Sequence, residues 1–274
     1  MELNSKAFKT LNNGLKMPII GLGTWKITDP EEVRVAVHTA LQTGYRLIDT
    51  AKIYKNEKFI GEAIRTSGVP REEIFVTSKV WMSDMSYRRT LAAFDESLKK
   101  LELDYLDLYL MHWPVPILRK NCWRALQELY KSGRCRAIGV ANHTGRHLEE
   151  LLADTEIIPT VNQVEFHPFL YQKDLQEFCG KNNIQLEAYS PLTHAYRLDD
   201  AKVGEIAKKY GRTNAQIMLR WNLQLGNIVI PKSVHPERIR ENFSVFDFTL
   251  SGEDMTFLNA LNENKHFIWD PNTM

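Results

Sequence analysis

The sequence predicts an α/β fold, namely a closed (β/α)8 barrel that takes up residues 1–274 as a single domain. Short apolar runs alternate with helical patterns, eight such runs are present, and no linker or low-complexity segment divides the 274 residues. Parallel neighbours need a crossover connection, which the intervening helices would provide. The eight runs lie at residues 19–22, 46–48, 74–77, 106–111, 137–140, 160–164, 185–189 and 228–230. A doubly wound open sheet is the alternative.

A β-hairpin is predicted before the first run, at residues 8–17. Its turn is Asn13-Gly14, a pair that favours a tight reversal between two strands. Because the hairpin lies outside the eightfold pattern, we expect it to plug one end of the barrel.

The first crossover helix has signals at both of its ends. Asp29 is placed as an N-cap, Pro30 follows at the first helical position, and a glutamate is placed to reach back to the cap. Gly44 supplies a left-handed stop. The apolar residues between these signals follow helical spacing: Val33, Ala36, Val37, Ala40 and Leu41.

Extra helices are predicted near the C-terminus. Residues 213–216 (Thr-Asn-Ala-Gln) open a helix before the eighth run, so the last crossover carries an insertion. Pro236 opens another helix after that run, and residues 251–254 cap a final one.

The composition argues against nucleic acid and membranes as partners. Lys+Arg 35 minus Asp+Glu 34 gives a net charge of +1, which provides no general field for nucleic acid or an anionic membrane. The three cysteines are widely spaced without a CxxC pair, and no apolar run resembles a signal peptide or a membrane span. We therefore expect a cytoplasmic monomer that acts on a small molecule.

A polar residue lies at the C-terminal end of each of the eight runs. The active sites of such barrels are located at the C-terminal ends of their strands. Any one of them alone is a weak signal, but an acid, an ammonium and an imidazole occur together. These residues are Thr24, Asp49, Lys79, His112, Asn142, Gln163, Tyr189 and Lys232.

The motifs around these positions occur in one order over nearly the whole chain. They are residues 21–25 (GLGTW), 49–51 (DTA) with Tyr54 and 56–57 (NE), 79–81 (KVW), 112–114 (HWP), 162–165 (NQVE) with 167–168 (HP), and 230–233 (IPKS). In this respect the sequence resembles the aldo-keto reductases. The resemblance implies a barrel that binds NADPH in extended form and reduces aldehydes and ketones to alcohols.

The resemblance also implies four catalytic residues. Tyr54 would donate the proton to the carbonyl oxygen while the nicotinamide supplies the hydride. Lys79 would lower the pKa of the phenol, and Asp49 would provide the counter-charge for that lysine. His112 would orient the carbonyl group by hydrogen bonding, or share the proton transfer. Without the resemblance, an ordinary ion pair and a loop tyrosine would be the simpler interpretation.

The resemblance to the aldo-keto reductases also implies which residues contact the cofactor. Asn142 and Gln163 would bind the nicotinamide carboxamide, and Tyr189 would stack on the ring. Ala141 stands where the family usually has serine, so one carboxamide contact is missing or supplied differently. The further positions implied for the cofactor are Gly23, Thr24, Ser190 and Leu192, and for its 2′-phosphate Lys232, Ser233, Val234, Arg238, Glu241 and Asn242.

Trp25, Trp81 and Trp113 follow three strand ends and would form the substrate pocket. The loop at 114–118 and the loop after Pro191 are short by the standards of the family, which suggests a more open pocket. In this respect the sequence resembles compact microbial-type members that reduce small aldehydes, dicarbonyls such as methylglyoxal, or keto-sugar acids, and in some cases prostaglandin endoperoxides. The tail containing His266, Phe267 and Trp269 is expected to close one side.

Other functional interpretations are weaker. Residues 21–23 (GLG) lack the third glycine of a Rossmann fingerprint, because position 26 is lysine. His143 and His147 have HxxxH spacing, but Thr144 stands where a zinc protease needs glutamate, so we expect surface histidines and no metal. Lys79 as a Schiff-base lysine of an aldolase, and a non-catalytic cofactor-binding member of the same fold, remain as alternatives.

Overall fold

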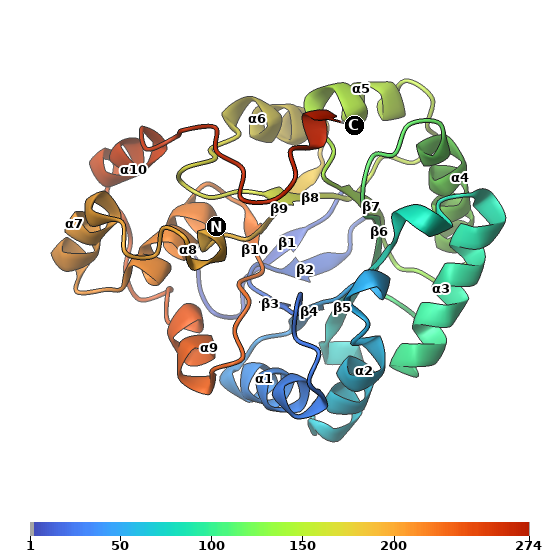
Figure 1. The fold of residues 1–274 in the computed structure, drawn as a ribbon, viewed down its shortest axis with the longest axis horizontal. Coiled ribbons are helices and arrows are strands. Elements are labelled where there is room, and N and C mark those ends of the chain that lie inside the picture. The colour runs from blue at the N-terminus through green and yellow to red at the C-terminus, as the bar shows by residue number, and fades with distance from the viewer. Residues whose placement is uncertain (1–2, 274) are drawn as a thin grey trace.

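The computed structural model describes residues 3–273, and it has the predicted (β/α)8, or TIM-barrel, fold (Figure 1). Within these residues eight parallel strands form one sheet in which sequence neighbours pair. The strands are β3 (Leu22–Gly23), β4 (Leu47–Asp49), β5 (Phe75–Val80), β6 (Leu108–Met111), β7 (Ile138–Ala141), β8 (Val161–Glu165), β9 (Gln185–Tyr189) and β10 (Ile228–Val229).

The sheet closes between its first and last strands. Ile20 forms a parallel bridge with Val229, and the Gly23 amide donates to the Pro231 carbonyl at 3.0 Å. A Cβ atom on Gly23 would lie 2.7 Å from the Ile230 carbonyl oxygen, so glycine is needed here for the strands to approach. This closure favours the barrel over the doubly wound open sheet.

The helices surround the strands as an outer ring (Figure 1). They are α1 (Pro30–Thr43), α2 (Glu57–Thr66), α3 (Tyr87–Leu101), α4 (Leu118–Lys131), α5 (Gly145–Leu152), α6 (Lys173–Lys181), α7 (Ala201–Tyr210), α8 (Asn214–Gln224), α9 (Pro236–Phe243) and α10 (Gly252–Asn259). Both α7 and α8 lie between β9 and β10, which confirms the predicted insertion.

The predicted helix ends are largely confirmed. The Asp29 carboxylate accepts from the backbone amides of Glu31 and Glu32, and Gly44 ends α1 with φ 117°. The reciprocal contact expected from Glu32, the third helical residue, is not formed among the described residues. Caps at the starts of α8 and α10 also form as predicted.

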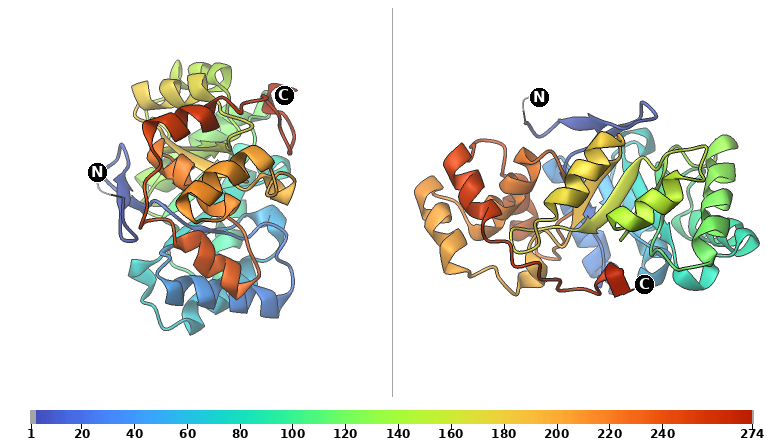
Figure 2. Two further views of the ribbon diagram at one scale, coloured as in Figure 1. Left: turned by 90° about the vertical axis from the view of Figure 1, so that its left-hand side faces the viewer. Right: turned by 90° about the horizontal axis from the view of Figure 1, so that it is seen from above.

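The hairpin plugs one end of the barrel. Strand β1 (Phe8–Thr10) pairs with β2 (Lys16–Pro18), and Gly14 takes φ 85° in the turn. Leu11 and Met17 are buried in one cluster with Leu47 and Phe75 from the barrel strands. Figure 2 shows the hairpin at one end of the barrel and the C-terminal tail at the opposite end.

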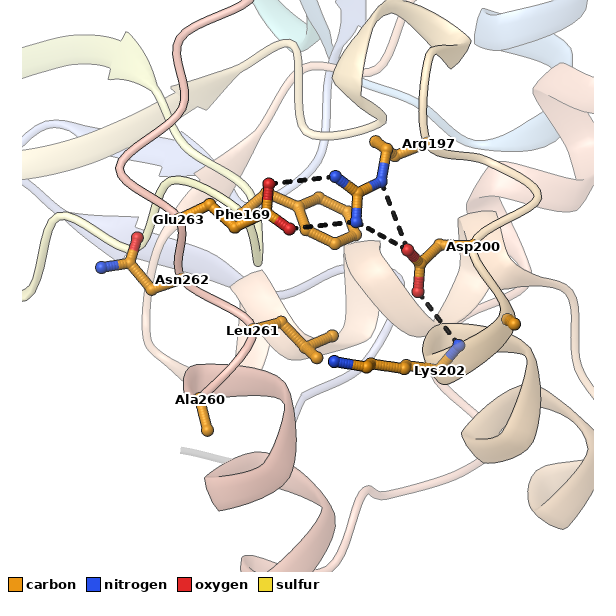
Figure 3. Close-up of a pocket in the computed structure, with 9 residues that line it drawn as sticks. Phe169, Arg197, Asp200, Lys202, Ala260, Leu261, Asn262 and Glu263 are labelled. Atoms are coloured by element: carbon orange, nitrogen blue, oxygen red, sulfur yellow. Dashed lines mark hydrogen bonds and ion pairs between the residues drawn. The ribbon is translucent and has the colours of Figure 1, made fainter.

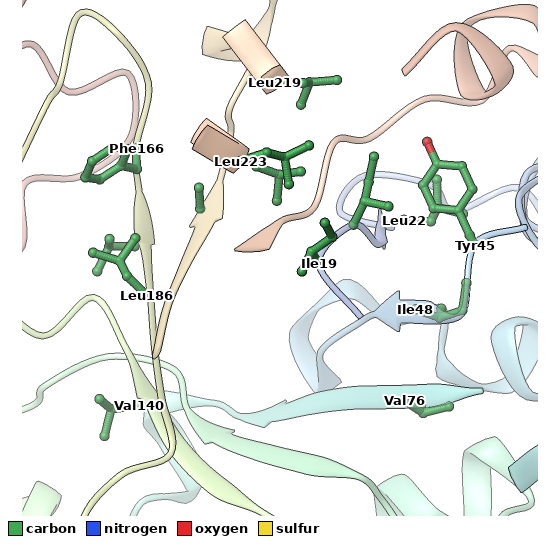
Figure 4. Close-up of a cluster of buried hydrophobic side chains, with 14 of the residues drawn as sticks. Ile19, Leu22, Tyr45, Ile48, Val76, Val140, Phe166, Leu186, Leu219 and Leu223 are labelled. Carbon is green, nitrogen blue, oxygen red and sulfur yellow. The ribbon is translucent and has the colours of Figure 1, made fainter. Parts of the chain in front are cut away.

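Side chains alternate between two cores along each strand. Leu22, Ile48 and Val76 point outward into the large cluster between strands and helices, as Figure 4 shows. Leu47 and Phe75 point into the barrel. The same alternation makes Asp49 and Lys79, two and four residues further along their strands, point inward as well. The period of two therefore directs polar side chains into the mouth opposite the hairpin.

No helix between residues 3 and 273 has the length and apolar character that crossing a bilayer requires.

Candidate active site

The mouth of the barrel opposite the hairpin contains a fully buried ion pair. Lys79 is 0% exposed, and its Nζ donates to Asp49 Oδ1 at 2.6 Å, to the Thr50 carbonyl at 2.9 Å and to the Tyr54 hydroxyl at 3.5 Å. An ammonium has three donors and no acceptor, so these contacts use all of them. The Tyr54 oxygen is therefore an acceptor in this contact, and its own O–H points away from Lys79.

Tyr54 reaches this position through a short 3-10 helix, Lys52–Tyr54, that follows β4. The Asn56 side chain fixes this loop, because its amide donates to the carbonyls of Thr24 and Ile27. Burial raises the pKa of the Tyr54 phenol well above its ordinary value, and the carboxyls of Asp49 and Glu187 raise it further. The expectation of a lowered pKa is therefore wrong for this state of the site, in which burial outweighs the nearby ammonium.

His112 follows β6 and faces Tyr54 across the mouth. Its ring lies 6.0 Å from the Tyr54 ring and 5.1 Å from the Trp81 ring, both in edge-to-face geometry. Burial, together with the Lys79 charge, lowers the pKa of the imidazole well below its ordinary value. His112 is therefore neutral near pH 7, with one N–H donor and one acceptor nitrogen.

Gln163 bridges two carboxyl groups in the floor of the site. Its Nε2 donates to Asp49 Oδ2 and to Glu187 Oε2, both at 2.8 Å. Burial raises the pKa of the Asp49 carboxyl, and Lys79 and Gln163 offset part of that rise. Asn142, in a left-handed conformation, donates to the His112 carbonyl and accepts from the Tyr189 hydroxyl at 2.7 Å.

These groups lie at the floor of a cavity of about 1280 Å³. Of the residues predicted to be catalytic, to bind the cofactor or to form the substrate pocket, Lys79 alone lies outside the lining, and it is fully buried in contact with Asp49 and Tyr54. The lining includes the other predicted site residues: Gly23, Thr24, Trp25, Asp49, Tyr54, Trp81, His112, Trp113, Asn142, Gln163, Tyr189, Ser190, Leu192, Lys232, Ser233, Val234, Arg238, Glu241 and Asn242. A cavity of this size accommodates a ligand larger than most drug-sized molecules.

Part of the cavity lining, called here the cationic end, carries two cations. Lys232 and Arg238 are exposed there, and helix α9 begins between them at Pro236. A helix N-terminus with two adjacent cations attracts a phosphate group. The cavity thus joins an anion-binding end to a floor of amide and phenol groups, a donor set that fits a phosphorylated nicotinamide dinucleotide.

Comparison with known proteins decides the family. The model of the aldo/keto reductase family matches residues 19–263. The chain belongs to the aldo/keto reductase family. It is 52% identical to the glyoxal reductase of Bacillus subtilis over 97% of this chain and 96% of that protein, and 45% identical to the methylglyoxal reductase DkgA of Salmonella typhimurium over 95% of both. The aldo-keto reductase of Bombyx mori, solved in complex with NADP, superposes with a TM-score of 0.92 at 35% identity, over 97% of this chain and 96% of that structure.

Membership confirms the class of enzyme expected from the sequence. The protein is an NADP-dependent oxidoreductase that reduces carbonyl groups to alcohols. This membership overturns the alternative interpretation of Lys79 as the Schiff-base lysine of an aldolase.

The C-terminal tail of the reductase is attached to the rim by one carboxylate. Glu165, the last residue of β8, accepts from the backbone amide of Phe267 at 2.9 Å and lies 3.2 Å from His266 Nδ1. Burial alone would raise the pKa of Glu165, but hydrogen bonds with His167, at 3.2 Å, with His266 and with the Phe267 amide lower it to about 2. Phe267 and Trp269 then line the cavity, and Trp269 lies 5.7 Å from Trp113, so the tail closes one side as predicted.

Two histidines are not where the sequence suggested. His143 and His147 are both 0% exposed, so the prediction of surface histidines is wrong. His143 Nδ1 lies 2.9 Å from the Ala141 carbonyl, and the His147 ring forms the capping box of α5 with Thr144. Burial lowers the pKa of His143 to about 3. In residues 3–273, no group of three or more His, Cys, Asp or Glu side chains is arranged to hold a metal ion.

Glu187 is the residue that the sequence reasoning missed. It lies two residues before Tyr189 on β9, so the alternation along that strand was the signal that places it inside the barrel.

A second, smaller depression lies outside the barrel mouth (Figure 3). Arg197 crosses it, pairing with Asp200 at 2.8 Å and with Glu263 at 3.1 Å while its guanidinium covers the Phe169 ring. These contacts tie the segment after β9 to the residues before the tail, and they leave the guanidinium paired with protein groups.

Proposed function

We propose that this reductase acts on small aldehydes and dicarbonyl compounds of the glyoxal and methylglyoxal type, and that Tyr54 is its proton donor. The names of the two bacterial relatives support the substrate class. The observation that carries the assignment of Tyr54 is the contact of Lys79 Nζ with the phenol oxygen.

The proton donor follows from the direction of that hydrogen bond. Because Lys79 can only donate, the Tyr54 O–H is free to face the cavity and a carbonyl oxygen placed there. NADPH, when bound, supplies a hydride to the carbonyl carbon. The carbonyl oxygen takes the Tyr54 proton, and the phenolate that remains is stabilised by the adjacent ammonium.

The raised pKa of Tyr54 fits this task, because it keeps the phenol protonated throughout the physiological range. The ammonium of Lys79 acts mainly on the phenolate that forms as the proton leaves, where each unit of pKa is worth about 1.4 kcal/mol. Neutral His112 donates one hydrogen bond that orients the carbonyl oxygen without competing as an acid.

Gln163, Asn142 and Tyr189 hold the nicotinamide. The Gln163 nitrogen is occupied by two carboxyls, so its carbonyl oxygen is the atom that accepts from the carboxamide NH2. Ala141 offers no hydroxyl to that carboxamide. Trp25, Trp81 and Trp113 form the apolar wall for the substrate, and Gly23, Thr24, Ser190 and Leu192 line the groove.

The cationic end prefers NADPH to NADH. Lys232 and Arg238 bind the 2′-phosphate. Ser233 and Val234, before α9, and Glu241 and Asn242, in its last turn, line the same cavity and complete this part of the cofactor site. A kinetic preference for NADH of tenfold or more would contradict this assignment.

The acid assignment is tested with Tyr54→Phe, which removes only the hydroxyl. We expect turnover of methylglyoxal, followed by NADPH absorbance, to fall by at least ~100-fold, while NADPH binding followed by fluorescence is nearly unchanged. Tyr130→Phe, on α4 and away from the cavity, is the matched control. Turnover of Tyr54→Phe within tenfold of the parent enzyme would refute the assignment.

We further propose that residues 1–274 form a single domain that acts as a monomer in the cytoplasm. The buried cysteines at 122, 135 and 179 are unpaired, which is typical of a reducing compartment. The monomer is tested by light scattering after size-exclusion chromatography, which measures molar mass. A monomer should give 31.8 kDa, and a dimer would give twice that mass.

A further inference from the structure

Glu187 is a second carboxyl group inside the barrel, next to the proposed catalytic residues. It is 0% exposed, and its Oε2 accepts from Gln163 Nε2 at 2.8 Å. Its Oε1 has no hydrogen-bond partner within the described part of the chain. The side chain lies outside the cavity lining, so it does not touch the substrate directly.

The buried charges around Glu187 do not balance if every group is ionised. Asp49 and Glu187 are two carboxyls, while Lys79 is the one cation that acts on them among residues 3–273, and it is already paired with Asp49 at 2.6 Å. An uncompensated carboxylate in a dry core is very costly, and a proton removes that cost. Since Asp49 has the ammonium, Glu187 is the group that must hold the proton.

We propose that Glu187 is a positioning residue that carries a proton in the resting enzyme and, with Asp49, fixes the orientation of the Gln163 amide. The two hydrogens of the Gln163 NH2 group then bind one carboxyl each, which leaves the amide carbonyl for the cofactor. The effect on catalysis rests on the proposed function of Tyr54, whereas the protonation of Glu187 does not.

The surroundings of Glu187 support the protonated form. The groups that act on it are Asp49 from β4, Lys79 from β5 and Gln163 from β8, while its β10 neighbour Ile228 is apolar. Burial and the Asp49 charge raise the pKa of Glu187 to about 8, against the weaker opposing effects of Gln163 and Lys79.

A consequence for the proposed acid follows from this geometry. When Glu187 loses its proton at alkaline pH, a second negative charge faces Tyr54, and that charge raises the pKa of the phenol. Tyr54 then becomes a weaker proton donor, so carbonyl reduction falls above about pH 8.

The direct test compares the thermal stability of Glu187→Gln with that of the parent from pH 5 to pH 9. If Glu187 is protonated in the folded protein, while in the unfolded chain it ionises above about pH 4.3, the folded state binds the extra proton. The free energy of unfolding of the parent therefore falls as pH rises between the two pKa values. Glutamine cannot titrate. We expect the Tm of E187Q to exceed that of the parent by roughly 5 °C or more at pH 9, with a much smaller difference at pH 5.

Two controls keep this test decisive. Glu177→Gln replaces an exposed glutamate on α6, and its effect on Tm should not depend on pH in this way. Glu187→Met, of similar length, should reproduce the pH-dependent gain if E187Q does not fold. In infrared difference spectra at pH 6, the parent should show a protonated carboxyl band that either variant lacks. A Tm difference independent of pH, or no such band, would overturn the proposal.

The catalytic consequence is measured separately. The alkaline limb of kcat for NADPH-dependent reduction should move upward by about one pH unit or more in E187Q. If Tyr54→Phe keeps its turnover, the proton-donor assignment fails, yet the Tm and infrared measurements still decide whether Glu187 is protonated. If Tyr54→Phe is inactive and E187Q has an unshifted limb, the Glu187 charge does not act on Tyr54 and the catalytic part of the proposal is overturned.

Discussion

Replacing Lys79 by methionine measures how much the buried Lys79–Asp49 ion pair contributes to the free energy of unfolding. The substitution keeps an unbranched side chain of similar length and removes the ammonium, so that the Asp49 carboxylate keeps Gln163 as its hydrogen-bond donor in a fully buried position. Removing one partner of a buried pair costs about 3–5 kcal/mol. We therefore expect a large loss of stability together with loss of turnover.

Protonation of Asp49 limits that loss and makes it depend on pH. The carboxyl has a pKa near 3.9 when unfolded, so protonating it costs about 1.4 kcal/mol per pH unit above that value, or about 4 kcal/mol at pH 7 and about 1.5 kcal/mol at pH 5. In Lys79→Met the folded state binds the extra proton, so its stability falls as pH rises. The destabilisation relative to the parent should thus be at least ~2 kcal/mol larger at pH 7 than at pH 5.

The assay is urea unfolding followed by circular dichroism at the two pH values. The double variant Asp49→Asn, Lys79→Met removes both charges, and it should recover most of the stability that Lys79→Met loses at pH 7. Equal losses at pH 5 and pH 7, or a double variant no more stable than Lys79→Met, would show that the pair does not carry this energy.

Two further predictions concern the cationic end of the cavity and a buried histidine. Arg238→Ala should weaken NADPH binding by about 10- to 100-fold and leave NADH binding nearly unchanged, since a hydrogen bond to a charged group is worth about 1.5–3 kcal/mol. The control is Arg240→Ala, because Arg240 is exposed on the same helix but lies outside the cavity lining. Equal losses of affinity for NADPH and NADH in Arg238→Ala would contradict the role of Arg238. His143 has its pKa lowered to about 3, so the unfolded chain binds the extra proton and the parent should lose about 2 kcal/mol between pH 8 and pH 5 that His143→Phe does not lose. An identical pH dependence of the two urea midpoints would refute this account.

Local pattern was sufficient for much of the fold. The eight strands, the hairpin and the inserted helix follow from periodicity and from caps such as Thr213 and Gly44, because these signals act within a few residues. Boundaries moved by a few residues, most clearly at the first strand, which was predicted at 19–22 and is Leu22–Gly23. There the pairing depends on the closure with β10, which is set by residues more than 200 positions away.

The candidate site divides in the same way. The sequence placed Asp49, Lys79 and His112 at strand ends, and the resemblance to a family suggested what they do. The alternation along β9 predicts that Glu187 points into the barrel, but no local pattern indicates that Gln163 links it to Asp49. His143 and His147 were predicted to be exposed but are buried, because HxxxH spacing does not indicate whether the two side chains face the solvent or the core.

What the sequence by itself determined is the order of the elements and, through the period of two, which side chains can enter the barrel. The tertiary structure decided which of them meet, since Gln163 donates to Asp49 from 114 residues away and the stagger of separate strands sets that distance. It also decided their protonation. Burial raises the pKa of Tyr54 and of Glu187, and burial is a property of the closed barrel that no segment has alone.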